Sequence, residues 1–74
     1  MNQDEQLKRV AELYAEIDIL DVKIGILKED IKDRIFQNTC YDVQKRELIE
    51  NYEARQKSRK ELMERLKDGG LIYI

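Results

Sequence analysis

The chain has 74 residues, of which 14 are basic and 16 acidic, so its formal net charge is only -2 although 41% of its residues are charged. This near balance excludes a strongly basic nucleic-acid-binding protein. Apolar residues make up 42% of the chain and proline is absent, which excludes the composition of a disordered tail. A chain this short forms one small domain at most, here residues 1–74, and its core supplies about 5 kcal/mol or less. We therefore expect an additional source of stability.

The N-terminal sequence does not have the pattern of a signal peptide. Acidic residues precede the first basic ones, and an amphipathic stretch follows where a signal peptide has an apolar block. The longest uncharged runs, residues 35–41 and 69–74, are far shorter than the roughly 20 apolar residues that span a bilayer. We therefore expect no membrane partner and a cytoplasmic location, and the single cysteine, Cys40, fits a reducing compartment.

Residues 4–36 carry apolar side chains at helical spacing, with no proline and a single glycine, Gly25, and this pattern predicts one long helix. Seven of the apolar residues are spaced alternately three and four apart, with Val or Ile at each a position and Leu at each d position of a coiled coil. These seven, which we name the heptad row, are Val10, Leu13, Ile17, Leu20, Ile24, Leu27 and Ile31. We expect the heptad row to be the surface of self-association.

A second apolar row lies on the opposite side of the same helix. This second row consists of Ala15, Ile19, Val22 and Ile26, and its centre lies roughly 160° around the helix from the heptad row. One partner helix cannot cover two opposed faces. We therefore expect one row to pack on the second helix and the other on a different chain, and the sequence leaves open which row does which. The alternative is a monomer in which the C-terminal tail covers part of the second row.

Charged residues beside the heptad row favour an antiparallel dimer. A parallel pair places like charges together, for example Lys23 beside Lys28 of the other chain. In an antiparallel pair Arg9 faces Asp30. In the same arrangement Glu16 faces Lys23, so both contacts are attractive. Such exposed pairs determine orientation and add little affinity. We expect a homodimeric four-helix bundle.

Turn-forming residues interrupt the helical pattern at residues 37–39. Asn38 suits the left-handed conformation that ends a helix, and Thr39 with Asp42 resembles a capping box. A second helix is predicted over about residues 40–68, because lysine and arginine lie near its end and two glycines follow. A connection this short makes the two helices antiparallel neighbours. The predicted fold is therefore all-α, an antiparallel helical hairpin.

A short apolar tail follows the two glycines. Its residues are Leu71, Ile72, Tyr73 and Ile74. Four consecutive large apolar side chains would make an adhesive segment if they were exposed on this charged protein. We expect the tail to dock on the bundle, and the alternative is that it adds as a β-strand to another chain.

The centre of the second helix is polar and contains a basic run. The candidate residues for binding a partner or an anion are Tyr52, Arg55, Lys57, Arg59 and Lys60. In a hairpin with this turn, Arg55 lies near Asp21 and Arg59 lies near Asp18, so we expect two ion pairs between the helices. The alternative is a basic notch that binds phosphate, nucleic acid or an acidic partner.

Catalysis has few candidate groups in this sequence. There is no histidine, so the hydroxyls of Ser58 and Thr39 have no histidine to activate them. We expect no enzyme activity, no cofactor and no metal site. The predicted function is that of a small self-associating helical adaptor or regulator, of the kind encoded by phages and mobile elements, with itself and another protein as partners. The alternatives are a nucleic-acid or small-anion (nucleotide) binder, which the acidic charge disfavours, and a purely structural oligomerisation unit.

Overall fold

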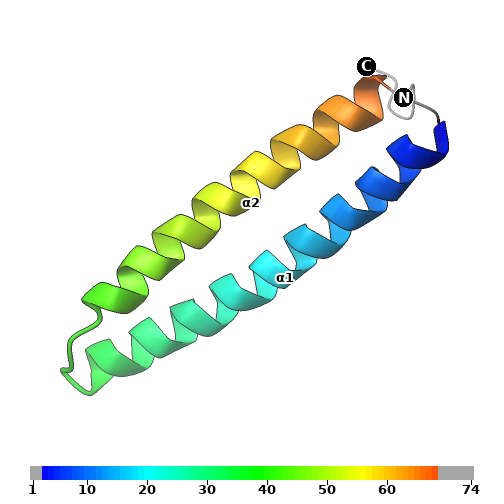
Figure 1. Cartoon of the computed structure of the whole chain (residues 1–74). Coiled ribbons are helices and arrows are strands. Elements are labelled where there is room, and N and C mark those ends of the chain that lie inside the picture. Colours follow the sequence, from blue (N-terminus) through cyan, green and yellow to red (C-terminus); the bar gives the residue numbers. More distant parts are fainter. Residues whose placement is uncertain (1–2, 69–74) are drawn as a thin grey trace.

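The computed structural model describes residues 3–68, which form two helices joined as an antiparallel hairpin (Figure 1). Helix α1 spans Gln3–Phe36 and helix α2 spans Asp42–Asp68. The described residues include no strand, so the predicted all-α hairpin is confirmed. The tail formed by Leu71, Ile72, Tyr73 and Ile74 lies outside the described residues.

The left-handed residue that the sequence indicates, Asn38, follows the end of helix α1 at Phe36. Asn38 has a φ of 58°, and its amide donates to the carbonyl of Ile35 at 3.1 Å. The amide of Thr39 donates to the carbonyl of Arg34 at 2.8 Å. These two bonds form a Schellman motif, which satisfies carbonyl groups that the end of a helix would otherwise leave without donors.

The start of α2 differs from the prediction. The Thr39 hydroxyl also donates to the Arg34 carbonyl, at 3.2 Å, so it closes α1 and does not cap α2. The chain therefore continues through residues 40 and 41 before α2 begins at Asp42. The carbonyl of Tyr41 accepts a hydrogen bond from the amide of Lys45 at 2.9 Å. Tyr41 is therefore the residue that directly precedes the first turn of α2. The capping box of Thr39 with Asp42 was a wrong prediction.

The heptad row lies on the inside of the hairpin. Leu13 is completely buried, and Val10, Ile17 and Ile24 are at most 8% exposed. Leu62 of α2 is 7% exposed and belongs to the same cluster as the first three of these residues, with Leu66 packed against it. The four buried side chains cannot contact another chain while the hairpin is closed. In the closed hairpin α2 covers these four residues of the heptad row, whereas Leu20, Leu27 and Ile31 are half-buried; self-association through the row stays a prediction.

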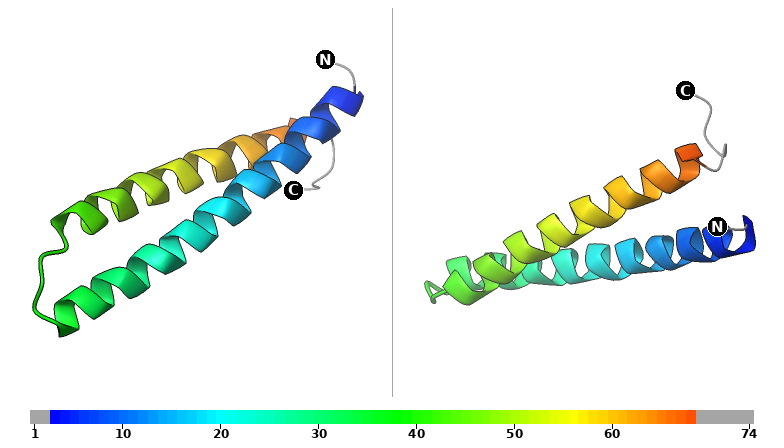
Figure 2. Two further views of the ribbon diagram at one scale, coloured as in Figure 1. Left: turned by 60° about the horizontal axis from the view of Figure 1, so that its bottom comes forward. Right: turned by 45° about the horizontal axis from the view of Figure 1, so that its top comes forward.

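The hairpin is long and thin. Its radius of gyration is 16.4 Å and its extents are 53 × 21 × 15 Å, whereas a compact domain of this length has a radius of gyration of about 11 Å. Figure 1 shows α2 running alongside α1, Figure 2 shows the same hairpin from two further directions, and α1 and α2 are the two elements that residues 3–68 form. An elongated two-helix structure has little interior, and it leaves one whole face of α1 to solvent.

Gly25 lies within α1, and a methyl group at this position would meet no atom within 4 Å. We expect Gly25→Ala to stabilise the hairpin by about 0.5–1 kcal/mol, because alanine loses less backbone entropy than glycine in a helix interior. Urea denaturation followed by circular dichroism would measure the change. A loss of stability would contradict the open, helical environment of this residue.

Candidate functional site

The second row is exposed on a side of α1 that α2 does not cover, and its residues Ile19 and Ile26 also border depressions shared with α2. Ile19, Val22 and Ile26 are 55%, 62% and 64% exposed, and Ala15 is exposed as well. The three large side chains follow one another over about two turns of α1. A contiguous aliphatic strip rimmed by charges is the kind of surface by which soluble proteins bind other proteins.

Three shallow depressions adjoin the second row. The first is lined by Asp18, Ile19, Val22 and Lys23. The other two lie between α1 and α2, and they are lined by Glu16, Ile19, Leu20, Ala54 and Ser58, and by Lys23, Ile26, Leu27, Glu47 and Asn51. The apolar strip therefore runs beside a negative charge at Glu16 and, two turns later, a positive charge at Lys23.

The basic residues of α2 form ion pairs with α1. The Arg55 guanidinium donates to the Asp21 carboxylate at 2.7 Å, which confirms the predicted pair. Arg59 lies 3.8 Å from the same carboxylate, so its predicted partner Asp18 was wrong. Asp18 instead lines the depression beside the second row, together with Ile19, Val22 and Lys23. One aspartate therefore balances two arginines.

The ring of Tyr52 makes cation–π contacts with Arg55 and Lys28. The Arg55 guanidinium lies 5.0 Å and the Lys28 ammonium 5.5 Å from the centre of this ring. An open depression there is lined by Tyr52, Arg55, Gln56 and Arg59. Lys57 and Lys60 are exposed and do not line it, so the structure gathers three of the five residues of the predicted basic site. Arg55 therefore already has two interaction partners within the hairpin, the Asp21 carboxylate and the Tyr52 ring.

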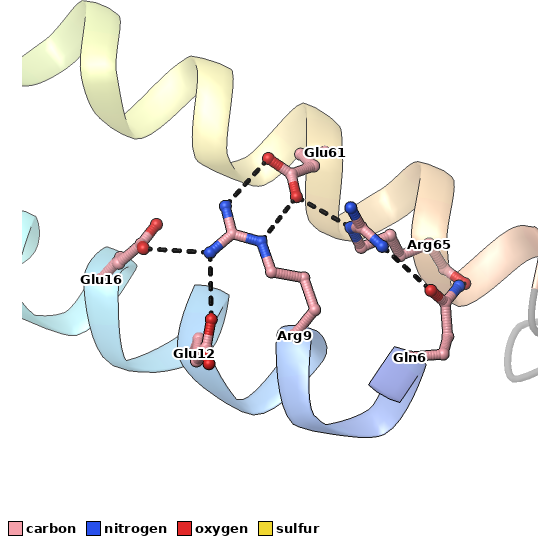
Figure 3. A network of polar contacts seen from close by, with 6 residues as sticks. All are labelled: Gln6, Arg9, Glu12, Glu16, Glu61 and Arg65. Carbon is pink, nitrogen blue, oxygen red and sulfur yellow. Dashed lines mark hydrogen bonds and ion pairs between the residues drawn. The ribbon is translucent and has the colours of Figure 1, made fainter. Parts of the chain in front are cut away.

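A polar network joins the helices near the chain ends (Figure 3). The Arg9 guanidinium donates to both carboxylate oxygens of Glu61, at 2.9 and 3.1 Å. The remaining guanidinium nitrogen of Arg9, Nη1, lies 3.3 Å from a carboxylate oxygen of Glu12 and 3.2 Å from one of Glu16. Glu61 also accepts a hydrogen bond from Arg65 at 2.8 Å. A two-pronged arginine–carboxylate pair fixes the geometry of both side chains, so this network holds α1 and α2 in register.

Sequence reasoning missed the link between Arg9 and Glu61. It assigned Arg9 to Asp30 of another chain, whereas the structure pairs Asp30 with Arg34 at 3.1 Å in the same helix. The signal that could have found the link is the position of Arg9 directly beside the heptad row. A long side chain next to a buried row reaches the helix that covers that row.

The network changes the ionisation of its central carboxylate. Hydrogen bonds from Arg9, and then from Arg65, lower the pKa of Glu61 from its ordinary 4.5 to about 2. The same contact with Glu61 raises the pKa of Arg9 above its usual value. A carboxylate with a lowered pKa in the folded state stabilises the fold above its unfolded pKa, and this contribution is lost as the pH falls through the folded value.

We therefore expect the melting temperature to fall more steeply for the wild type than for Glu61→Gln between pH 4.5 and pH 2. Above this range the wild type should be the more stable of the two, and the difference should disappear near pH 2. Thermal melts at several pH values would show it, with Glu64→Gln as the control because Glu64 is exposed and takes no part in the network. Parallel curves for wild type and Glu61→Gln would contradict the role of this carboxylate.

Within residues 3–68, no three His, Cys, Asp or Glu side chains lie where they could hold a metal ion. Neither α1 nor α2 is both long and apolar enough to cross a membrane. Comparisons of the chain with protein-family models, with curated proteins and with solved structures gave no match.

Proposed function

We propose that this protein is a small helical adaptor or regulator that acts through protein–protein contacts made by the second row of α1. The observation that supports it best is the exposure of Ile19, Val22 and Ile26, each more than half exposed on a face that α2 leaves uncovered. Helix-on-helix recognition uses aliphatic residues at this spacing, because they form a continuous ridge that another helix can cover.

The alternative of a nucleic-acid or anion site has less support. Its central cation, Arg55, is held by Asp21 at 2.7 Å and lies over the ring of Tyr52. An incoming phosphate would have to compete with that carboxylate, and Lys57 and Lys60 do not line the same depression. A purely structural oligomerisation unit would use the second row as well, and it differs from an adaptor in binding no other protein.

Site-specific photo-crosslinking in the source cells would test this function. A photoreactive amino acid in place of Val22 should give crosslinked protein, because this side chain lies at the centre of the second row. The matched control is Val43 on α2, which is 60% exposed compared with 62% for Val22. Crosslinks at Val22 to protein, and few at Val43, are expected; crosslinks to another protein would support the adaptor, whereas crosslinks to a second copy alone would support the purely structural alternative. Equal crosslinking at both sites, or crosslinks at Val22 to nucleic acid alone, would contradict the proposal.

A further inference from the structure

We propose that the partner of the second row is a second copy of this chain, bound α1 against α1 in antiparallel orientation. The inference rests on the proposed function, because it names the protein that the second row contacts; this contact with a second copy is one that the purely structural alternative shares. The second copy would cover the exposed side chains of Ile19, Val22 and Ile26. On the opposite side of each α1, α2 keeps its place over the heptad row.

The second row is complementary to itself in an antiparallel arrangement. Its spacing of four, three and four residues allows Ile19 to face Val22 of the second copy. In the same register Ala15 faces Ile26 of the second copy, so each small side chain meets a large one. A two-fold axis between Ile19 and Val22 relates both sets of contacts, and the interface is therefore closed and symmetric.

The charges beside the row agree with this orientation. The flanking positions of this antiparallel pair are shifted by two residues relative to the apolar layers. On one flank, Glu16 of each copy therefore faces Lys23 of the second copy, and the two-fold axis makes this pair occur twice. Both residues lie beside the apolar depressions that the row would fill. On the other flank Asp18 faces Gly25 of the second copy, which brings no like charges together. The flanks thus contribute attraction without repulsion.

The ends of α1 discriminate between the two orientations. Antiparallel pairing sets Lys8 against Asp33 of the second copy, an attractive pair, and Glu12 against Glu29, a repulsive one. In parallel pairing each of these four charged residues faces the identical residue of the second copy, so that all four contacts are repulsive. The antiparallel orientation is therefore the one that the charges support.

The amount of exposed surface also fits a dimer. The chain exposes 5954 Å², whereas a compact monomer of 8.9 kDa exposes about 4,800 Å². A stable interface removes about 800 Å² from each partner, which is less than this excess. The resulting assembly is a layer in the order α2, α1, α1, α2. It differs from the compact four-helix bundle expected from the sequence, because the heptad row is already covered.

Sedimentation equilibrium of the purified full chain tests whether a second copy binds. The wild type should have twice the chain mass of 8.9 kDa at micromolar concentration. Val22→Gln should weaken the dimer about 100-fold, since two apolar side chains lose their burial. Val43→Gln, at a valine of equal exposure on α2, should leave it unchanged. A folded wild-type monomer would overturn the inference, and crosslinks at Val22 to a different protein would then still support the proposed function.

A pair of glutamates tests the orientation. Glu12 and Glu16 both contact Arg9 within the hairpin, at 3.3 and 3.2 Å, so each charge reversal removes one such contact. Glu16→Lys should weaken the dimer about tenfold, and adding Lys23→Glu should restore it. Glu12→Lys should strengthen the dimer, because it relieves the repulsion from Glu29 of the second copy. Weakening by both single reversals to the same extent would overturn the antiparallel arrangement.

Discussion

Replacing Leu13 by alanine is expected to destabilise the hairpin by about 2–5 kcal/mol. Leu13 is the one described side chain with no exposed surface, and it lies in the cluster that joins α1 to Leu62 of α2. Its truncation leaves a cavity that a two-helix structure cannot fill from a second layer. A chain of this length has a total stability of about 4–11 kcal/mol, so the loss is a large fraction of the whole. Urea denaturation followed at 222 nm would measure it.

Leu7 of the same helix is the matched control, because it is 46% exposed. Leu7→Ala removes the same atoms from a position that water already reaches, and we expect it to cost less than about 1 kcal/mol. Equal losses for the two leucines would show that α2 does not cover the face of α1 that contains Leu13.

The second large effect is expected for Ile24→Asp, which should abolish folding at every protein concentration. Ile24 is 3% exposed, and an aspartate there would place an unpaired carboxylate on the inside of the hairpin. Burial of such a charge costs several kcal/mol or forces the structure to open. Circular dichroism should therefore show the loss of helical signal together with the loss of a cooperative melt.

Ile26→Asp is the companion variant, two residues further along and 64% exposed. It should leave the helical signal and the melt of a dilute sample nearly unchanged, because the new charge stays in water. It should nevertheless weaken association at higher concentration, since Ile26 belongs to the second row. Unfolding by both substitutions, or by Ile26→Asp alone, would contradict the assignment of inner and outer faces.

Much of the fold follows from periodicity and turn chemistry. The long apolar repeat, the left-handed Asn38 and the shortness of the connection were sufficient to predict two antiparallel helices. The pairing of Arg55 with Asp21 followed from the same hairpin geometry.

Which face of α1 is buried could not be predicted, because both rows are apolar and a repeat identifies faces without stating what covers them. The inner positions of α2 gave no guide. Around its centre the half-buried residues are Asn51, Tyr52, Arg55 and Ser58, and this mostly polar set does not match an aliphatic row. The network of Arg9 with Glu61 was missed for a related reason. A flexible arginine reaches across more than one helical turn, and its partner depends on where the helices lie.

Disulfide trapping tests whether two copies meet through their second rows. In chains with Cys40→Ser, which removes the exposed native thiol, one preparation carries Ile19→Cys and another carries Val22→Cys. Mild oxidation of the mixture should give the mixed disulfide as the main product, because these two positions face each other across the two-fold axis. A chain with Ile49→Cys, 49% exposed on α2, is the control and should form disulfides slowly. Disulfide formation in the mixture no faster than in this control would show that the second rows of two copies do not meet.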